Sequence, residues 1–370
     1  MALTTVSSDR LSTNVKTSNL GSELSKKVGQ NKNLIINGQF DIWQRGTDSG
    51  SNTTDGVLAC DRWMLASSGA TKQVTRQTFT LAQTDVPSNP KYFLRYAVTV
   101  GNNNAGLRQR IEGVDRVQGA VTLTFYAKGT NPGGGTFNIT NRQDFGTGGS
   151  ASSVVDTSIG NFTVTSSWAK KTFTFTPPSI SGKTLGTNNN SYYELEVFRQ
   201  PAGDTSTAAY TIDIANVQLE VGSVSTDIEV RSHAEELALC ERYYQRGRYS
   251  SYCQVGTPGT YYFSRGNIPL FTPMRGTITG TVNAASNISN RYFAFKTWAD
   301  QTNVTTAPAA VSFSSRKADG GDNPHSDVIS VDVSINISSG SSNSPLPANG
   351  PGANNVYPIE YYDIELDAEL

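Results

Sequence analysis

Histidine is scarce in this chain of 370 residues, and its scarcity restricts the catalytic chemistry that can be expected. His233 and His325 are the only two histidines, and they lie far apart in the sequence. A catalytic triad needs a histidine beside a nucleophile and an orienting acid, but no Gly-x-Ser-x-Gly segment is present. The chain also lacks a His-Glu-x-x-His segment, a P-loop and a dinucleotide-binding fingerprint. We therefore expect neither enzymatic activity nor a bound cofactor.

Cysteine is almost as scarce. Cys60, Cys240 and Cys253 provide no disulfide framework and no Cys-x-x-Cys spacing for a metal. Their odd number and wide separation favour three reduced thiols that are buried or partly buried. We expect no metal site from them.

Charge and long apolar runs are limited as well. Charged residues make up 16% of the chain and the formal net charge is -1, so no basic excess favours nucleic acid as a partner. The chain has no apolar run of transmembrane length, which argues against membrane insertion. Residues 1–20 contain no apolar segment of the kind found in secretory signals.

The chain is instead rich in Thr, Ser, Gly and Asn, with many Tyr and Phe, a composition typical of short strands joined by tight turns. Apolar and polar residues alternate, as in half-buried strands, over residues 74–79, 92–100, 121–127, 170–176, 193–198 and 210–219. Loops rich in Gly, Asn and Ser separate these segments, with no helical pattern between them. This arrangement predicts an antiparallel β-sandwich, or jelly roll, over residues 33–228.

Residues 1–32 differ from this β pattern. Leu20, Leu24 and Val28 are spaced like one apolar stripe of a short helix. Because one stripe cannot form a core alone, this helical arm is expected to pack against another subunit, another protein or the body of the chain. The alternative is an N-terminal arm that is partly disordered.

A second helical signal interrupts the β pattern within residues 229–248. Ser232 and Glu235 have the spacing of a capping box, in which each side chain binds the other's backbone N–H. Good helix formers follow, and Gly247 is a typical C-terminal stop. One face of this predicted connecting helix carries Leu237, Cys240 and Tyr244.

The β pattern returns in residues 249–370. Strand-like alternation recurs over residues 260–263, 277–282, 291–295, 328–337 and 359–366. A unit of this size suits one further β-sandwich. The predicted fold class is therefore mainly β, with a helical arm, a jelly roll, a connecting helix and a second, C-terminal β-sandwich domain.

Acidic residues are numerous enough to include a catalytic pair. Glycoside cleavage needs one carboxyl group that protonates the leaving oxygen and another that attacks or activates water. The candidates are Asp41, Asp61, Asp115, Glu194 and Glu196. No spacing among them is diagnostic. Asp41 and Asp213 are also candidates for the calcium site that ties the terminal strands of some jelly rolls, although a solvated or hydrogen-bonded aspartate is the simpler interpretation.

Aromatic residues give a stronger indication of binding. Sugar rings present apolar C–H faces that stack on Trp and Tyr, while neighbouring polar side chains bind the hydroxyls. The candidate glycan contacts are Trp63, Trp168 and Trp298. A tryptophan beside Phe and Ile in a sandwich is more often part of the core, and this interpretation is favoured for Trp43 and Trp63.

Several segments must be considered as a set. They are residues 33–46 (Asn-Leu-Ile-Ile-Asn-Gly-Gln-Phe-Asp-Ile-Trp-Gln-Arg-Gly), 61–63 (Asp-Arg-Trp), 218–226, 229–244, 269–275 and the C-terminal Asp367-Ala368-Glu369-Leu370. Together they resemble a tail-protein module found in many tailed bacteriophages: its opening, its closing strand, the helix that follows and the chain end. The resemblance covers most of residues 33–370.

The resemblance implies a structural protein of the virion, such as a tail fibre or another component of host attachment, and a homotrimer. The opening and closing segments also resemble those of jelly-roll carbohydrate-binding modules, which implies a glycan-binding ancestry without defining ligand residues. Those modules usually have Glu where this chain has Asp41, so their calcium site is not carried over.

The leading hypothesis is therefore a tail component of the virion that contacts other virion proteins through residues 1–32. One alternative is a protein that decorates the capsid. Another is an adhesin that binds a glycan of the host surface, and a third is an enzyme that degrades host polysaccharide.

Overall fold

The computed structural model describes the chain from residue 32 onward, with gaps. The described residues are 32–58, 60–66, 69–100, 105–133, 135–200, 208–255, 261–275, 278–282, 294–296, 303–304, 310–317, 328–338 and 356–369. The predicted arm, with Leu20, Leu24 and Val28, lies outside them, as do Trp298 and His325. None of the helices among the described residues is long and apolar enough to cross a membrane.

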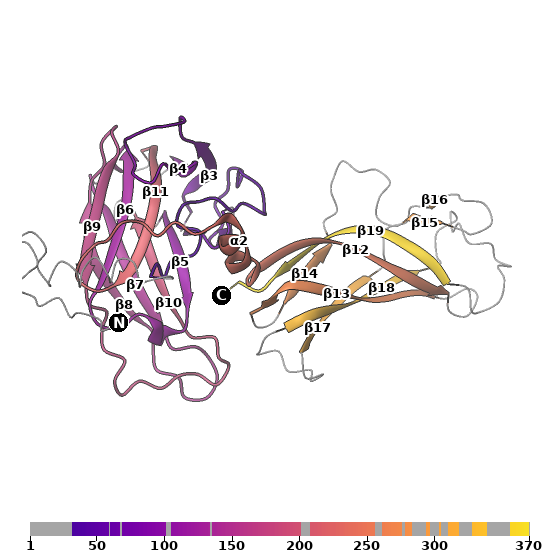
Figure 1. Ribbon diagram of the computed structural model, residues 1–370. Coiled ribbons are helices and arrows are strands. Elements are labelled where there is room, and N and C mark those ends of the chain that lie inside the picture. Colours follow the sequence, from indigo (N-terminus) through magenta and orange to yellow (C-terminus); the bar gives the residue numbers. More distant parts are fainter. Residues whose placement is uncertain are drawn as a thin grey trace, which may run out of the picture.

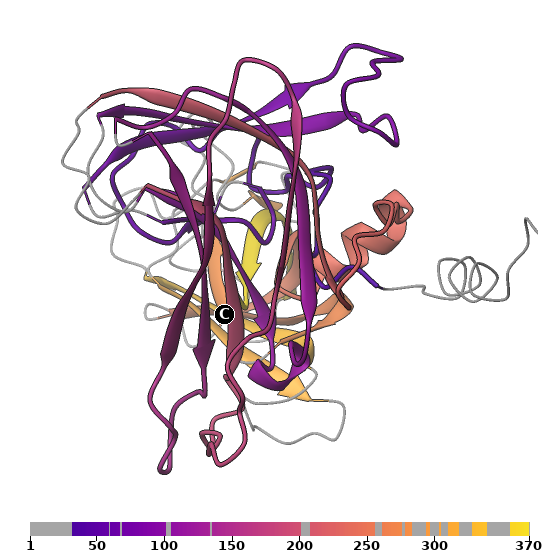
Figure 2. The same cartoon turned by 90° about the vertical axis from the view of Figure 1, so that its left-hand side faces the viewer.

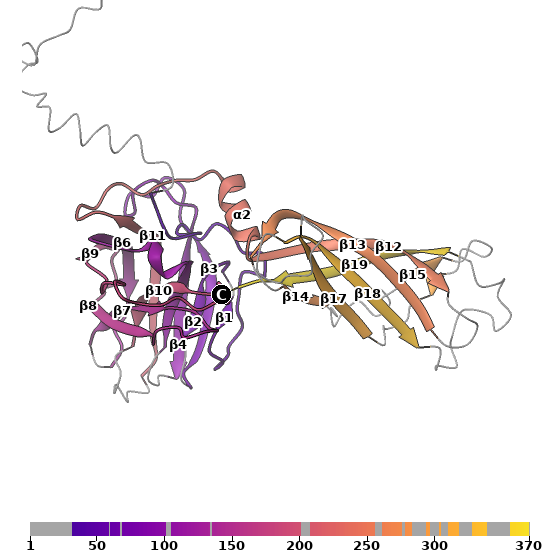
Figure 3. The same cartoon turned by 90° about the horizontal axis from the view of Figure 1, so that it is seen from below.

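The first part of the chain, which we call the body, is a sandwich of two antiparallel sheets (Figures 1 and 3). One sheet has six strands in the order β1-β2-β5-β10-β7-β8, and the other has five in the order β3-β4-β11-β6-β9. The elements are β1 (Val57–Leu58), β2 (Met64–Ala66), β3 (Thr71–Thr78), β4 (Tyr92–Val100), β5 (Gly106–Glu112), the 3-10 helix η2 (Val114–Arg116), β6 (Val121–Gly129), β7 (Phe137–Asp144), β8 (Val155–Phe162), β9 (Ala169–Phe175), β10 (Tyr192–Arg199) and β11 (Tyr210–Val221). The predicted β-sandwich is confirmed.

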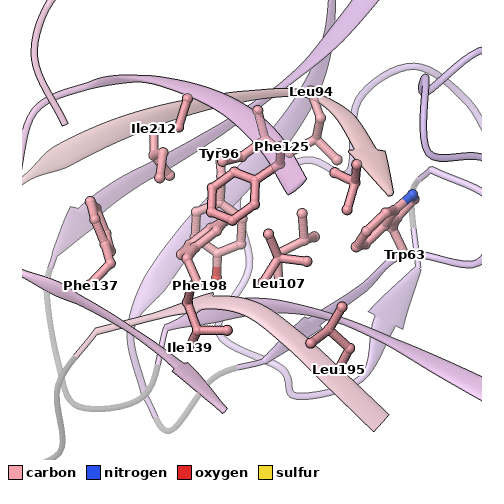
Figure 4. Packing of buried hydrophobic residues seen from close by; sticks show 14 of the residues in the cluster. Trp63, Leu94, Tyr96, Leu107, Phe125, Phe137, Ile139, Leu195, Phe198 and Ile212 are labelled. Carbon is pink, nitrogen blue, oxygen red and sulfur yellow. The ribbon is translucent and has the colours of Figure 1, made fainter. Parts of the chain in front are cut away.

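The inner faces of the two sheets form one hydrophobic core (Figure 4). Leu94, Tyr96, Phe125 and Ile212 come from the five-stranded sheet and meet side chains of the six-stranded sheet. Those partners are Leu107, Phe137, Ile139, Leu195 and Phe198. Rings pack edge to face across the interface, as Tyr96 does against Phe198 at a centroid distance of 5.0 Å. Because alternate residues of each strand point inward, the remaining ones form two outer faces.

The opening segment, residues 33–46, contributes buried residues without forming a strand. It lies against β11, where the Leu34 N–H donates to the carbonyl of Leu219 at 2.8 Å and the Val217 N–H donates to that of Gly38 at 2.9 Å. A Cβ atom at residue 38 would lie 2.2 Å from the Val217 carbonyl oxygen, so only glycine permits this approach. The opening and closing segments of the sandwich are therefore packed together.

Helix α2 (His233–Glu241) follows the body. Its predicted capping box is present: the Glu235 N–H donates to Ser232 Oγ at 3.3 Å, and the Ser232 N–H donates to Glu235 Oε2 at 2.8 Å. The prediction that the helix continues to Gly247 is wrong, because β12 begins at Tyr244 and pairs there with Asp367. Pairing with a distant strand overrides the local helix propensity.

The rest of the described chain forms one antiparallel sheet of eight strands, which we call the distal sheet. Its order is β16-β15-β19-β12-β13-β18-β17, with β14 paired to β19. Its strands are β12 (Tyr244–Val255), β13 (Tyr261–Met274), β14 (Thr279–Val282), β15 (Ala294–Lys296), β16 (Asn303–Val304), β17 (Ala310–Lys317), β18 (Val328–Ser338) and β19 (Val356–Asp367). Each of the five strand-like segments predicted after residue 249 overlaps a strand here.

The body and the distal sheet meet at a junction that includes α2, the start of β12 and the end of β19 (Figures 1 and 3). In Figure 2 the body lies in front of the distal sheet. The Arg45 guanidinium lies 3.7 Å from the ring centroid of Tyr244 and 3.0 Å from an Asp367 oxygen. The Arg62 guanidinium lies 3.4 Å from the ring centroid of Tyr243 and pairs with Glu369. Cation–π contacts and ion pairs therefore join the two parts.

Candidate functional site

A groove of about 410 Å³ crosses the outer face of the six-stranded sheet. Strands β5, β7, β8 and β10 supply most of its lining, and β10 lies between β5 and β7. The lining residues are Asp55, Ala66, Arg108, Thr140, Asn141, Arg142, Asp156, Thr157, Ser158, Glu194, Glu196 and Arg199. The lining of the groove is therefore polar and rich in charged side chains of both signs.

Strand alternation explains why charged side chains gather here. On β10, Tyr193 and Leu195 belong to the core, so Glu194 and Glu196 lie on the opposite face. On β5, Leu107 belongs to the core and Arg108 to the groove. The register of the sheet places these residues opposite one another, since Glu194 pairs with Arg110 and Glu196 with Arg108.

Ion pairs hold the groove side chains in place. Arg110 Nε donates to Glu194 Oε2 at 2.8 Å, and Arg108 Nε lies 3.7 Å from the same oxygen. Arg142 binds both oxygens of Asp156, at 2.8 and 3.0 Å. Two-point pairing of this kind fixes the planes of both groups, so the groove presents ordered donors and acceptors.

Glu196 is the most perturbed of the groove acids. Burial raises the pKa of its carboxyl group to about 7, although Arg199 and a hydrogen bond from Thr140 oppose the rise. Thr140 Oγ1 donates to Glu196 Oε2 at 2.8 Å, and Arg199 Nη1 lies 3.6 Å away. Near neutral pH this carboxyl group therefore exchanges between an acceptor and a donor form.

The chemistry of the groove differs from that of a stacking site. No aromatic ring belongs to its lining among the described residues. Guanidinium, carboxylate and hydroxyl groups alternate along it, and these groups bind ligands by hydrogen bonds and charge. An extended ligand with many hydroxyl groups matches this arrangement, because each hydroxyl can donate and accept.

The three tryptophans that the structure describes lie in two different environments. Trp63 is fully buried and its indole N–H donates to the Asn37 carbonyl at 2.9 Å. Trp43 is 9% exposed and donates to the Phe40 carbonyl. Both belong to the core, as the favoured interpretation held, so Trp63 offers no ring to a glycan in this structure.

Trp168 lies on the outer face of the five-stranded sheet, away from the groove. It packs against Phe79 and Phe93, each with a centroid distance of 5.3 Å, and Lys128 Nζ lies 5.0 Å from its ring. The ring is half-buried, so part of it faces solvent. Its role as a glycan contact remains a prediction, as does that of Trp298, which lies outside the described residues.

The five acidic candidates are not gathered at one site. Glu194 and Glu196 both lie in the groove, whereas Asp61 lies at the junction, where it accepts from the Gln44 N–H at 2.6 Å. Asp115 lies on η2 and is exposed. Burial raises the pKa of Asp41, and the nearby side chains of His233, Lys91 and Arg76 partly offset this rise.

The calcium candidates have cationic neighbours instead of further acids. Arg95 binds Asp213 through two hydrogen bonds of 2.8 and 2.9 Å, and Asp41 lies near His233. Across the described part of the chain, no group of three or more His, Cys, Asp or Glu residues could hold a metal ion. Cys60 and Cys240 are buried free thiols, as predicted, and burial raises the pKa of both.

Sequence reasoning missed the arginines of the groove and the strands that carry them. β5, β7 and β8 were absent from the predicted strands, although Leu107, Gln109 and Ile111 alternate with Arg108 and Arg110. The alternation of the two arginines with uncharged residues, two of them apolar, was the available signal. It marks a strand with one charged outer face.

Comparisons with known proteins concern the fold. No protein-family model and no curated protein sequence matches the chain. Among solved structures, an enzymatically active domain of tailspike protein 4 from bacteriophage CBA120 is similar at 19% identity and a TM-score of 0.31, over 51% of this chain and 21% of that one. The chain thus spans about a fifth of that tailspike structure.

Two bacterial proteins are similar over about half of the chain. A putative sugar binding protein from Bacteroides thetaiotaomicron has 15% identity and a TM-score of 0.31, covering 51% of this chain and 99% of that one. The CBM22-1 xylan-binding domain from Paenibacillus barcinonensis Xyn10C has 15% identity and a TM-score of 0.27, covering 49% and 97%. At these values the likenesses transfer no ligand, partner or activity to this chain.

Proposed function

We propose that this protein is a structural component of a tailed-bacteriophage virion, part of a tail fibre or of the host-attachment apparatus, and that its body binds a surface glycan of the host. The groove of about 410 Å³ on the six-stranded sheet carries the proposal. The protein binds without cleaving in this proposal, and it resides in the virion.

The groove supports an extended polyhydroxylated ligand. It is open along one sheet and its polar side chains already have fixed positions, since Arg142 is held by Asp156 and Arg110 by Glu194. Preorganised polar groups bind with little loss of side-chain entropy. Hydroxyl groups of a glycan can replace water around such pairs without breaking them.

The virion part of the proposal depends on the sequence resemblance. Its segments are in contact in this fold. Arg231, in the segment at residues 229–244, donates to the carbonyls of Asn33 and Ile35 in the opening segment, and the Leu34 N–H of the opening segment donates to the carbonyl of Leu219 in the closing strand. Segments that resemble one module therefore build one structural unit, which supports a shared architecture.

A direct test measures binding of the purified protein to host surface polysaccharide by isothermal titration calorimetry. The variant Arg142→Ala removes a groove cation that is 39% exposed, so the fold is retained. We expect its affinity to fall at least tenfold, corresponding to about 1.4 kcal/mol. The matched control is Arg76→Ala, a change of the same kind on β3 of the other sheet, which should bind normally. Equal affinities for both variants would exclude the groove.

We also propose a homotrimer that attaches to other virion proteins through residues 1–32. A light-scattering mass of three chains at micromolar concentration is the expected result, and a mass of one chain would contradict it. Electron microscopy of intact particles separates a tail position from the alternative of a capsid-decorating protein. Both positions need a stable, exposed β-rich module.

One observation favours polysaccharide cleavage as a second candidate. Glu194 and Glu196 are two residues apart on one strand, so their Cα atoms are about 6.6 Å apart, and burial raises the pKa of Glu196 to about 7. Glycoside cleavage uses two carboxyl groups, of which one donates a proton to the leaving oxygen, and Glu196 is the one whose raised pKa suits that donor role. Incubation with host glycan that releases new reducing ends, and loses this activity in Glu196→Gln, would favour the enzyme. No release supports binding alone.

A further inference from the structure

A second concavity, of about 350 Å³, lies on the outer face of the five-stranded sheet, on the opposite side of the sandwich from the groove. Its floor includes Thr124 and Tyr126 of β6 and Gln218 of β11. Leu123 and Phe125 alternate with these β6 residues and belong to the core, which places Thr124 and Tyr126 on the outer face. We call this concavity the rear cavity.

Two segments tied to the floor form the rim of the rear cavity. One is the loop at residues 87–88, where Asn216 Nδ2 donates to the Pro87 carbonyl at 2.9 Å and to Ser88 Oγ at 3.2 Å. Asn216 lies at a bulge of β11, with φ of 51°. The extra residue of a bulge changes where its side chain points, and here the amide reaches the loop.

The other rim segment is the strap at residues 226–228, between β11 and α2. Thr226 donates to both oxygens of Glu220, from N at 2.8 Å and from Oγ1 at 2.6 Å. Lys32 Nζ donates to Thr226 Oγ1 and to the Asp227 carbonyl, each at 2.7 Å. Both rims are therefore held in place before any ligand arrives, which lowers the entropic cost of binding.

The polar side chains that line the rear cavity include both hydrogen-bond donors and acceptors. The amides of Asn216 and Gln218 already bind the rims, since Asn216 donates to the Pro87 carbonyl and Gln218 to the Asp227 carbonyl. Lys170 supplies a cation and Asp227 a carboxylate, so the lining has no strong preference for a charged ligand. Burial and the nearby Asp227 raise the pKa of Tyr126, which keeps its phenol protonated.

Thr124, on the floor of the rear cavity, carries a hydroxyl group that no described residue satisfies. Its side chain is 6% exposed, and among the described residues its Oγ1 has no hydrogen-bond partner. A buried hydroxyl without a partner destabilises the fold. Because Thr124 Oγ1 is closed to solvent, a ligand gains a hydrogen bond to it only by seating deeply on the floor of the cavity. The lining also offers apolar surface from Tyr126, Pro87 and Ile228.

We propose that the rear cavity is a second binding site, which takes one neutral pyranose-sized sugar ring. A pyranose has apolar C–H faces that suit the Tyr126 ring, and hydroxyl groups at its edge that both donate and accept. Lys170, Asp227 and Thr124 match those hydroxyls. The proposal goes beyond the groove, because it names a different face and a single sugar ring instead of an extended chain.

The test uses the full chain and a panel of neutral methyl glycopyranosides, observed by saturation-transfer NMR and titrated to millimolar concentration. The variants are Thr124→Val, which keeps the side-chain shape, and Lys170→Met, which changes an exposed residue. We expect at least a fivefold weaker binding in each. The melting temperature of Thr124→Val should be unchanged or higher, because the hydroxyl it removes has no protein partner.

The groove variant Arg142→Ala is the matched control and should bind the methyl glycoside like the wild type. Absence of binding by the wild type, or wild-type affinity in both Thr124→Val and Lys170→Met, would overturn the rear cavity as a site. Loss of binding in Arg142→Ala alone would also overturn it, and would assign the sugar to the groove. If the protein binds the methyl glycoside but not the polysaccharide, only the proposal for the groove is contradicted. The two proposals can therefore fail separately.

Discussion

Glu196 links the chemistry of the groove to the stability of the body. In the folded protein burial raises the pKa of its carboxyl group from the ordinary 4.5 to about 7. Between these values the folded state holds a proton that the unfolded state has released, so stability is complete below pH 4.5 and falls as the pH rises toward 7. The loss is on the order of 3 kcal/mol.

The variant Glu196→Gln isolates this contribution, because its amide has no titrating proton. We expect the variant and the wild type to have similar free energies of unfolding near pH 4.5, and the variant to be more stable at pH 8. Urea unfolding at several pH values, followed by circular dichroism, measures the difference. A difference that does not change with pH would show that Glu196 titrates normally.

Asn37 stabilises the start of the body through its side-chain hydrogen bonds. It adopts a φ of 57°, and its buried side chain donates to the carbonyls of Ile42 and Asp61 at 2.9 and 3.0 Å and accepts from the Ile42 N–H at 3.0 Å. Replacement by alanine removes these bonds and leaves buried backbone groups without partners. We expect Asn37→Ala to lose about 3 kcal/mol of stability.

Asn37→Gly is the control for backbone strain, because glycine adopts positive φ without penalty. It should be less destabilising than Asn37→Ala by about 1 kcal/mol. Denaturant unfolding of both variants, followed by tryptophan fluorescence, provides the comparison. If the two variants are equally stable, the left-handed conformation contributes nothing, and the hydrogen bonds explain the whole effect.

At the scale of elements, sequence patterns predicted some strands well and others not at all. β4 was predicted with its observed bounds, Tyr92–Val100, because its apolar residues alternate along its whole length. β7 was missed since Asn141 and Gln143 are buried alongside Phe137 and Ile139, so the inward positions change from apolar to polar. The groove was not predicted, because Arg108 and Arg142 lie on strands that were missed and because strand patterns do not say which strands are neighbours in a sheet.

Helix α2 shows the same limit. Its first turn is determined by local chemistry, and the capping box of Ser232 and Glu235 was predicted correctly. Its end is determined by Tyr244, which pairs with Asp367 at a large distance in the sequence. Local propensity does not contain that information.

Glu112, the last residue of β5, connects three elements and makes their packing sensitive to acid. Arg242, just after α2, binds both its oxygens at 2.9 and 3.0 Å, Tyr243 Oη donates to it at 3.2 Å, and Arg275, just after β13, lies 3.2 Å away. Burial raises the pKa of Glu112, but the two arginines outweigh it, so the pKa lies below the ordinary 4.5. The stabilisation is therefore present above pH 4.5 and is lost as the pH falls below it.

We expect Glu112→Gln to cost about 1 kcal/mol at neutral pH, since the pairs are partly exposed. The difference from the wild type should shrink as the pH falls through 4 toward 3. Thermal unfolding of the two proteins across this range measures it. A constant difference would mean that the carboxylate is not the group that joins these elements.

At the scale of the whole molecule, the chain end holds the distal sheet against the body. The Ala368 N–H donates to the Tyr243 carbonyl at 2.8 Å, and Glu369 pairs with Arg62, whose side chain is 2% exposed. Figures 1 and 3 both show α2 between the two parts. The sequence resemblance identified residues 367–370 without explaining them. Their role is visible only once distant segments are folded together.

The double variant Asp367→Asn, Glu369→Gln leaves Arg45 and Arg62 without these carboxylates. Removing one side of a buried ion pair costs about 3 kcal/mol or more, because the remaining charge stays desolvated. We expect the double variant to unfold at a lower urea concentration than the wild type. We also expect a larger radius of gyration by small-angle X-ray scattering, because the distal sheet then moves relative to the body. The control Asp156→Asn breaks an exposed pair and should change stability by less than about 1 kcal/mol.

An unchanged scattering profile in the double variant would mean that α2 and Glu112 suffice to fix the two parts.

A fixed angle between the body and the distal sheet has a consequence for attachment to the host. If the chain end keeps the body and the distal sheet at one angle, then the groove on the six-stranded sheet has a fixed orientation relative to the distal sheet. In an oligomer, each copy would then present its groove in the same orientation. Several weak glycan contacts would act together and raise the overall affinity for the host surface.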